Sequence, residues 1–147
     1  MGNKKILIAI TLVIVLVIIL LIIYLPTSSD SPVFNEKKPQ DKNALVGDWL
    51  RTDASYLIKI KSIKDDGILE ANYFNPRPIN VESATFEESY GNLKIILVLR
   101  DVNYPGSKYS LNYLPDRDML AGEYFQAVEG LTFYVEFARD KANSQRK

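Results

Sequence analysis

The chain has 147 residues, contains neither cysteine nor histidine, and carries 18 cationic and 18 anionic side chains, so its formal net charge is zero. Without cysteine and histidine it cannot form Cys–His nucleophilic pairs, Ser-His-Asp triads or the usual zinc sites. The charge is unevenly spread, since residues 45–138 hold nine Lys or Arg and fourteen Asp or Glu. An acidic region without a basic stripe is a poor nucleic-acid binder and a poor partner for anionic lipid.

Residues 1–25 are predicted to form an N-terminal transmembrane anchor. After Lys4 and Lys5 come twenty uncharged residues, which begin with Ile6 and end with Leu25. At ~1.5 Å per residue, a helix of this length spans about 30 Å, the hydrocarbon thickness of a bilayer. This length, and the lack of an Ala-x-Ala-like site after it, favour an uncleaved signal anchor over a cleaved signal peptide. The two lysines indicate a single-pass protein with a cytoplasmic N-terminus and an extracytoplasmic C-terminal domain, in the periplasm or at the cell surface.

Two polar segments flank the predicted domain. Residues 26–44 combine three prolines and three serines with few apolar side chains, so we expect a flexible linker. Residues 139–147 are expected to be a polar tail. Between them, residues 45–138 are predicted to form one domain, near the size at which a single core is adequate.

Within this domain, apolar and polar side chains alternate with a period of two, as half-buried strands require. Turn-forming residues, including Gly67, Gly91 and Gly106, separate the alternating runs. The predicted strands are 47–52, 55–63, 67–74, 79–88, 92–101, 107–114, 119–127 and 131–138. They predict an all-β fold, in which an antiparallel up-and-down meander closes into a small eight-stranded barrel, because closure removes exposed edges.

Many aromatic side chains are predicted to share the interior of this barrel. Eight strands enclose either packed side chains or one small ligand. Bulky rings favour a filled barrel, whereas inward hydroxyls that need partners would suit a small amphipathic guest. Both alternatives stay open. The predicted interior rings are Tyr56, Tyr73, Tyr109, Tyr113, Tyr124, Phe133 and Phe137.

The sequence Gly47-Asp48-Trp49, at the start of the first strand, resembles the Gly-x-Trp opening of the lipocalin, avidin and fatty-acid-binding superfamily, the calycins. This resemblance implies an up-and-down barrel in which Gly47 and Trp49 form a structural motif and Trp49 closes one end beneath the core. Residues 75–81, 100–107 and 122–127 are similar to a group of exported, membrane-anchored bacterial proteins of uncharacterised function. That second resemblance implies a place in the bacterial cell envelope, without an activity or a ligand.

Polar residues near the ends of the predicted strands are the candidate ligand-binding groups. Two prolines hold the segment around Arg77 extended, so we expect an edge or a rim loop there, where Arg77 would be able to meet an anionic ligand. Ordinary turn structure is the alternative interpretation, both for this segment and for the loop after residues 93–99. The candidates are Arg77, Asn80, Arg100, Asn103, Tyr124 and Gln126.

Neighbouring carboxylates are the remaining candidates for chemistry: Asp65-Asp66, Glu87-Glu88 and Asp116-x-Asp118. All lie in or beside predicted turns, where Asp is common for conformational reasons. None has the spacing of a calcium loop, and no phosphate-cradling glycine loop occurs. We therefore expect no catalytic residues, no metal and no cofactor.

The leading hypothesis is a membrane-tethered, lipocalin-like β-barrel that acts as a non-enzymatic binding or interaction module of unknown ligand, with a small amphipathic molecule as one candidate. The alternative is a structural or assembly protein of the cell envelope that acts through contacts with an envelope protein. An enzyme that uses Asp116 and Asp118 is the least favoured hypothesis. Nucleic acid is not an expected partner.

Overall fold

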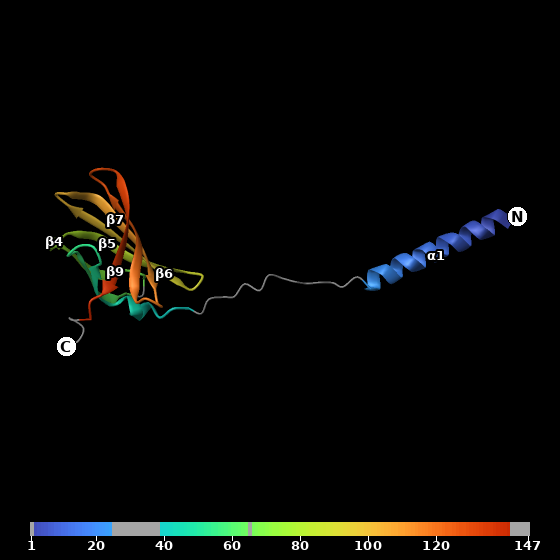
Figure 1. The fold of residues 1–147 in the computed structure, drawn as a ribbon, viewed down its shortest axis with the longest axis horizontal. Helices are drawn as coiled ribbons and strands as arrows, with labels where there is room; N and C mark the ends of the chain where they lie inside the picture. Colours follow the sequence, from blue (N-terminus) through green and yellow to red (C-terminus); the bar gives the residue numbers. More distant parts are fainter. Residues whose placement is uncertain (1, 25–38, 65, 142–147) are drawn as a thin grey trace. The chain divides into compact units, whose positions relative to one another are not determined.

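The computed structural model describes residues 2–24, 39–64 and 66–141. The chain divides into two units, residues 1–35 and 36–147. The first contains helix α1 (Gly2–Tyr24), which is drawn in Figure 1. Its residues 12–21 are exposed. Within the described ranges, no helix combines the length and the apolar character that a membrane crossing requires. Leu25, the side chain of Ile6, most of the predicted linker and the end of the predicted tail lie outside the described residues.

The described part of the second unit contains a 3₁₀ helix, η1 (Lys42–Leu45), followed by nine antiparallel strands. Their order in the sheet is β4-β3-β2-β1-β9-β8-β7-β6-β5. Each strand pairs with the next one in the sequence, except that β4 does not pair with β5. In addition, β1 pairs with β9. The strands are β1 (Gly47–Arg51), β2 (Leu57–Ile63), β3 (Leu69–Asn75), β4 (Arg77–Ile79), β5 (Val81–Ser89), β6 (Asn92–Asp101), β7 (Tyr104–Leu114), β8 (Met119–Gln126) and β9 (Leu131–Arg139).

This sheet curls into a nearly closed barrel (Figure 1). At the remaining seam, between β3 and β5, the backbone N–H of Phe86 donates to the carbonyl of Gly67 at 2.9 Å. An isolated bridge between Ile68 and Thr85 adds a second contact there. The prediction of an all-β antiparallel meander is therefore confirmed.

The predicted number of eight strands is wrong, because the segment expected to be an edge or a rim loop contains a ninth strand. Strand β4 folds back on β3 and places Arg77 opposite Asn75 and Pro78 opposite Phe74. Pro76 and Pro78 have no N–H to donate, so the sequence offered no ladder pattern here. The strand is tolerated because β4 lies at the edge of the sheet order, where one side needs no partner.

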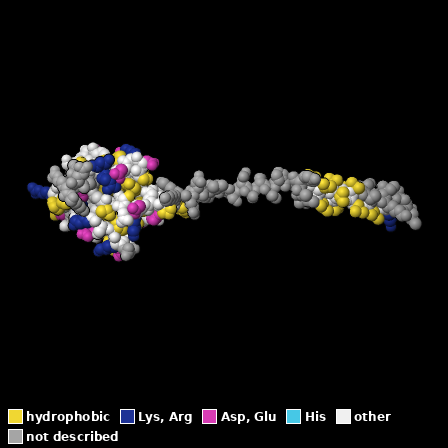
Figure 2. Space-filling model, turned by 90° about the horizontal axis from the view of Figure 1, so that it is seen from below, with side chains coloured by type: hydrophobic (Ala, Val, Ile, Leu, Met, Phe, Trp, Pro, Cys, Tyr) yellow, Lys and Arg dark blue, Asp and Glu magenta, His cyan; other side chains and the backbone are white. Residues whose placement is uncertain are grey.

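Alternation along the strands fills the barrel with apolar side chains. In β6, Leu93, Ile95, Leu97 and Leu99 are all buried. Of the seven predicted interior rings, Tyr73, Tyr109 and Phe137 are buried in the core, and Tyr56, Tyr113 and Tyr124 pack against it half-buried. The seventh, Phe133, is exposed, so its predicted interior position is wrong. Outside the barrel, Lys and Arg side chains are interspersed with Asp and Glu on the face of the domain that Figure 2 shows.

One end of the barrel is closed by Trp49, which is fully buried and donates its indole N–H to the carbonyl of Leu45 in η1 at 2.9 Å. The guanidinium of Arg139, the last residue of β9, lies 4.1 Å from the centre of the Trp49 ring. It also donates to a carboxylate oxygen of Asp118 at 2.7 Å and to the carbonyls of Ala44 and Val46 at 2.6 and 3.0 Å. These residues are called the closed end below.

Gly47 is required at the closed end for two reasons. Its φ of +145° is one that residues with an L side chain rarely adopt. A Cβ at this position would also lie 2.5 Å from a terminal nitrogen of Arg139. The Gly-x-Trp sequence therefore corresponds to a structural unit in which Gly47 leaves room for the arginine that covers Trp49.

Candidate functional site

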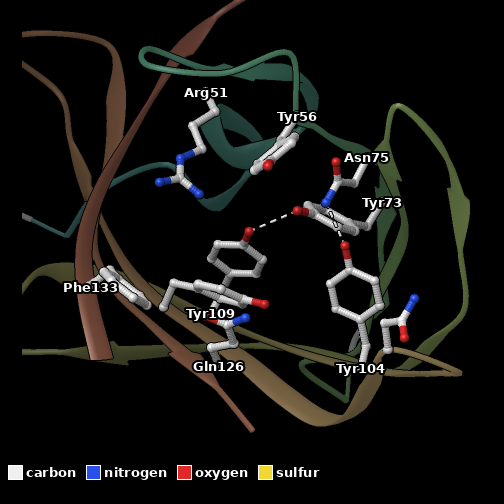
Figure 3. Close-up of a pocket in the computed structure, with 10 residues that line it drawn as sticks. Arg51, Tyr56, Tyr73, Asn75, Tyr104, Tyr109, Gln126 and Phe133 are labelled. Carbon is white, nitrogen blue, oxygen red and sulfur yellow. Dashed lines mark hydrogen bonds between the residues drawn. The ribbon is translucent and has the colours of Figure 1, made fainter. Parts of the chain in front are cut away.

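The other end of the barrel holds a pocket of about 290 Å³ (Figure 3). Strand ends and turns that are distant in sequence meet here, because in a meander every second connection lies at the same end. Ten residues line the pocket: Arg51, Tyr56, Tyr73, Asn75, Asn103, Tyr104, Tyr109, Tyr124, Gln126 and Phe133.

Strand alternation explains why most of these side chains point inward. Trp49 is buried, so Arg51, two residues further along β1, faces the same interior. The same spacing relates Tyr73 to Asn75 on β3 and Tyr124 to Gln126 on β8. The polar residue of each pair lies nearer the end of its strand, so polarity increases toward the pocket mouth.

Two buried tyrosines form the base of the pocket. The hydroxyls of Tyr73 on β3 and Tyr109 on β7 are 2.8 Å apart and hydrogen-bonded across the barrel interior. Tyr109 also stacks on Tyr124, with ring centres 4.5 Å apart, and meets the edge of Phe137 at 5.5 Å. Burial raises the pKa of both Tyr73 and Tyr109, so both phenols are neutral at physiological pH.

Arg51 is the cation of the pocket. Its side chain is 13% exposed, and its Nε and one terminal nitrogen donate to the two carboxylate oxygens of Asp53 at 2.5 and 3.0 Å. The guanidinium also lies 5.2 Å from the centre of the Tyr56 ring. Burial lowers its pKa, but the bonds and charges of Asp53 and Tyr109 outweigh burial and leave that pKa raised. Arg51 is therefore charged at any physiological pH.

Polar and aromatic groups form the rim. The side-chain amide of Asn75 donates to the hydroxyl of Tyr104, and the Tyr104 ring meets the edge of Tyr73 with ring centres 6.4 Å apart. Gln126 and Phe133 come from the two strands of the β8–β9 hairpin (Figure 3). Phe133 remains 43% exposed, so the rim offers an apolar surface beside its amides.

The structure brings three of the six predicted binding residues into this pocket: Asn103, Tyr124 and Gln126. The other three lie outside its lining. Arg77 is exposed on β4, and Arg100 is exposed and paired with Glu82 at 2.7 Å. Asn80 accepts a hydrogen bond from the backbone N–H of Arg100 and donates its own backbone N–H to Asp101.

Sequence reasoning did not identify Arg51, Asn75 or Tyr104 as pocket residues. For Arg51 a signal was present, since it follows the predicted inward Trp49 by two positions. For Tyr104 no signal was available, because the ladder between β6 and β7 shifts register at Leu99 and Arg100. Such an irregularity breaks the period of two that assigns side chains to a face.

The candidate acidic pairs do not enter the pocket. Asp118 bonds to Arg139 and accepts from the hydroxyl of Tyr113 at 3.2 Å, both at the closed end. In the part of the chain that the structure describes, no group of three or more acidic side chains is placed to hold a metal ion. Asp65 lies outside the described residues.

Comparison with known proteins found no matching family model, curated protein or solved structure. The function of the chain must therefore be inferred from the pocket itself. Chemically, that pocket offers one fixed cation, several neutral phenols, three amides and a partly exposed ring.

Proposed function

We propose that this protein is a non-enzymatic binding module, a calycin-like barrel that holds a small amphipathic molecule at its open end. The observation that carries the proposal is the contrast between the two ends. The closed end is sealed by Trp49 and Arg139, whereas the opposite end keeps a pocket of about 290 Å³ lined by polar tips.

The volume of the pocket, about 290 Å³, lies at the lower end of the range of small-molecule sites, which is about 300–1,000 Å³. A cavity of ~150 Å³ already accepts a benzene molecule, so this pocket has room for a small organic ligand. Its mixture of rings and a few convergent polar groups is typical of ligand sites.

The lining supports binding without bond cleavage. None of the described residues that line the pocket carries a carboxylate, and the chain has no histidine or cysteine. The raised pKa values of Tyr73 and Tyr109 make both phenols poor general bases near neutral pH. Binding is therefore the activity that these groups are suited to perform.

The proposal includes a tether to the membrane, with the barrel outside the cytoplasm. Its support is the sequence: the uncharged residues 6–25, the preceding Lys4 and Lys5, and the proline- and serine-rich stretch that follows. Alkaline extraction of cell membranes tests the tether, since a tethered chain stays in the pellet. Protease added outside the cytoplasmic membrane tests the orientation, because it should digest the barrel only if that part is extracytoplasmic.

Native mass spectrometry of the full chain, purified in detergent from its source, tests the binding function. We expect a small molecule to co-purify with the wild type and to be lost from Gln126→Trp, which fills the pocket mouth. Lys108→Trp is the matched control, because Lys108 is exposed on the outer face of β7. Wild-type protein that is consistently empty would contradict the binding function.

A second candidate function, docking to an envelope protein, is favoured by exposed apolar side chains on the β8–β9 hairpin. Val128 is 61% exposed, Leu131 is 47% exposed and Tyr134 is 68% exposed. Crosslinking in intact cells, compared between the wild type and Val128→Ser/Tyr134→Ser, tests this candidate. A reproducible protein partner that disappears with the double variant would support it.

A further inference from the structure

We propose, on the basis of the binding function above, that the ligand is a small monoanion with a flat aromatic ring, such as a one-ring aromatic carboxylate. Its anionic group would lie at Arg51, and its ring would lie along the tyrosines of the pocket wall. The arrangement of charge, rings and hydroxyls in the pocket carries this assignment.

Charge is the first argument. Arg51 is a largely buried cation in a lining without a carboxylate among the described residues, so the pocket attracts anions and disfavours cations. Asp53, which is 63% exposed, occupies Nε and one terminal nitrogen of Arg51 and leaves the other terminal nitrogen free of that carboxylate. In Figure 3 the guanidinium points into the cavity toward Tyr109. A ligand anion would share or replace Asp53.

The total charge of the domain argues for a monoanion. Residues 45–138 hold five more acidic than basic side chains. This surplus repels every anion, and it repels a multiply charged anion such as a phosphate dianion more strongly than a monoanion. Arg51, which a ligand would share with Asp53, is the only cation among the described residues of the lining. Charge matching therefore favours a single carboxylate.

Ring geometry is the second argument. Tyr109 and Tyr124 are stacked, and Tyr73 meets the edges of Tyr56 at 6.5 Å and Tyr104 at 6.4 Å. These spacings are the ones at which aromatic rings attract one another, so a further ring can continue the cluster. A volume of about 290 Å³ admits one ring with a short polar substituent.

The hydroxyls supply the third argument. Because Tyr73 and Tyr109 stay protonated, each has one proton to donate. Only one of these two protons lies between their oxygens, which are 2.8 Å apart. The other proton can be donated to a carboxylate oxygen, so Arg51 and a phenol together would bind an anionic group from two sides.

Isothermal titration of the full chain in detergent with four probes tests the inference. Benzoate is the aromatic monoanion, benzamide its neutral analogue, benzamidine the cation and cyclohexanecarboxylate the anion without an aromatic face. We expect benzoate to bind at least tenfold more tightly than benzamide, benzamidine not to bind, and cyclohexanecarboxylate to bind several-fold more weakly than benzoate. Gln126→Trp gives the baseline for partition into the micelle.

Variants of the ion pair separate charge from fold. Arg51→Gln should weaken benzoate binding about tenfold or more and benzamide binding much less, so that the preference for the anion is lost, whereas Arg51→Lys should keep most of that preference. Asp53→Asn should strengthen benzoate binding, because the competing carboxylate is gone. Arg100→Gln is the matched control, since Arg100 is exposed and outside the pocket. Circular dichroism confirms that each variant is folded.

The outcomes distinguish this inference from the binding function. Equal binding of benzoate and benzamide, or benzoate binding that Arg51→Gln leaves unchanged, would overturn the anionic class while the pocket still binds. If no probe binds but mass spectrometry recovers a neutral or cationic molecule, the class is wrong and the binding function stands. If the wild type is also empty, both fail.

Discussion

Arg139 connects three parts of the closed end, so its replacement gives the sharpest test of how the barrel is held together. The side chain is 18% exposed and bonds to Asp118 at 2.7 Å and to the carbonyls of Ala44 and Val46 at 2.6 and 3.0 Å. Its guanidinium also stacks on Trp49 at 4.1 Å. No single neutral side chain can make all of these contacts.

We expect Arg139→Gln to lower the free energy of unfolding by about 2–4 kcal/mol. Hydrogen bonds from a charged donor contribute ~1.5–3 kcal/mol each, and a partly buried cation–π contact adds roughly 1 kcal/mol. The full sum is not expected, because the site is partly exposed and water can reach the two carbonyls. A loss of this size corresponds to a fall in melting temperature on the order of 10 °C or more.

The measurement is urea unfolding of the full chain in detergent, followed by the fluorescence of Trp49. Trp49 is the only tryptophan of the chain, so the signal reports on this end of the barrel. Arg139→Lys keeps the charge but not the planar fork or the stacking, so we expect an intermediate loss of stability.

Arg117→Gln is the matched control, because Arg117 is 55% exposed and pairs with Glu136 at 3.3 Å. An exposed pair of this kind contributes about 0.5 kcal/mol or less. If Arg139→Gln were no more destabilising than Arg117→Gln, the closed end would not depend on the arginine, and the steric reason for Gly47 would fail with it, although its positive φ would remain.

Three further predictions concern the two ends of the barrel. The hydrogen bond from Arg139 lowers the pKa of Asp118 below the ordinary value of 3.8. The ionised carboxylate therefore stabilises the fold above that pH, and this stabilisation is lost as the pH falls through the lowered pKa. Asp118→Asn should therefore flatten the fall of the melting temperature between about pH 5 and pH 2. Gly47→Ala should lower the melting temperature more than Gly106→Ala, since both have positive φ but only Gly47 has a close neighbour, and equal losses would contradict the steric argument. Tyr73→Phe should lower the free energy of unfolding, measured in urea, by about 1 kcal/mol. The double variant with Tyr109→Phe should lower it by less than the sum of the two single variants, and additive losses would contradict the coupling of the two hydroxyls.

Much of the barrel could be predicted because most of its strands alternate apolar and polar side chains with a period of two. In β6 the residues 93–99 are apolar on both faces, but the turn residues on either side still marked the strand, and the predicted strand 92–101 has the observed bounds. Prediction was wrong at β4, because Pro76 and Pro78 conceal a three-residue edge strand that is visible only when β3 supplies its partner. The alternation of apolar and polar residues within β4 does not reveal a strand whose formation depends on its pairing with β3.

Pocket residues could be predicted from the sequence where their strand pairs with its neighbours without a shift of register. Tyr124 and Gln126 lie on β8, which keeps its register with β7 and β9, and both are pocket residues. The candidates Arg77 and Arg100 were chosen for charge near a strand end, but charge does not indicate which face a side chain occupies. Arg139 was assigned to a polar tail, because its role depends on Trp49, ninety residues earlier in the chain.

The hydroxyl pair of Tyr73 and Tyr109 marks the boundary between two parts of the interior. Between this pair and the closed end, the interior is packed with aliphatic residues and Trp49. Between the pair and the open end, hydroxyls, amides and Arg51 line the pocket. Stability should therefore depend mainly on the closed end and selectivity mainly on the open end. Gln126→Trp should change binding without lowering the free energy of unfolding, which a barrel packed throughout would not allow, because an overpacked core costs about 1–3 kcal/mol.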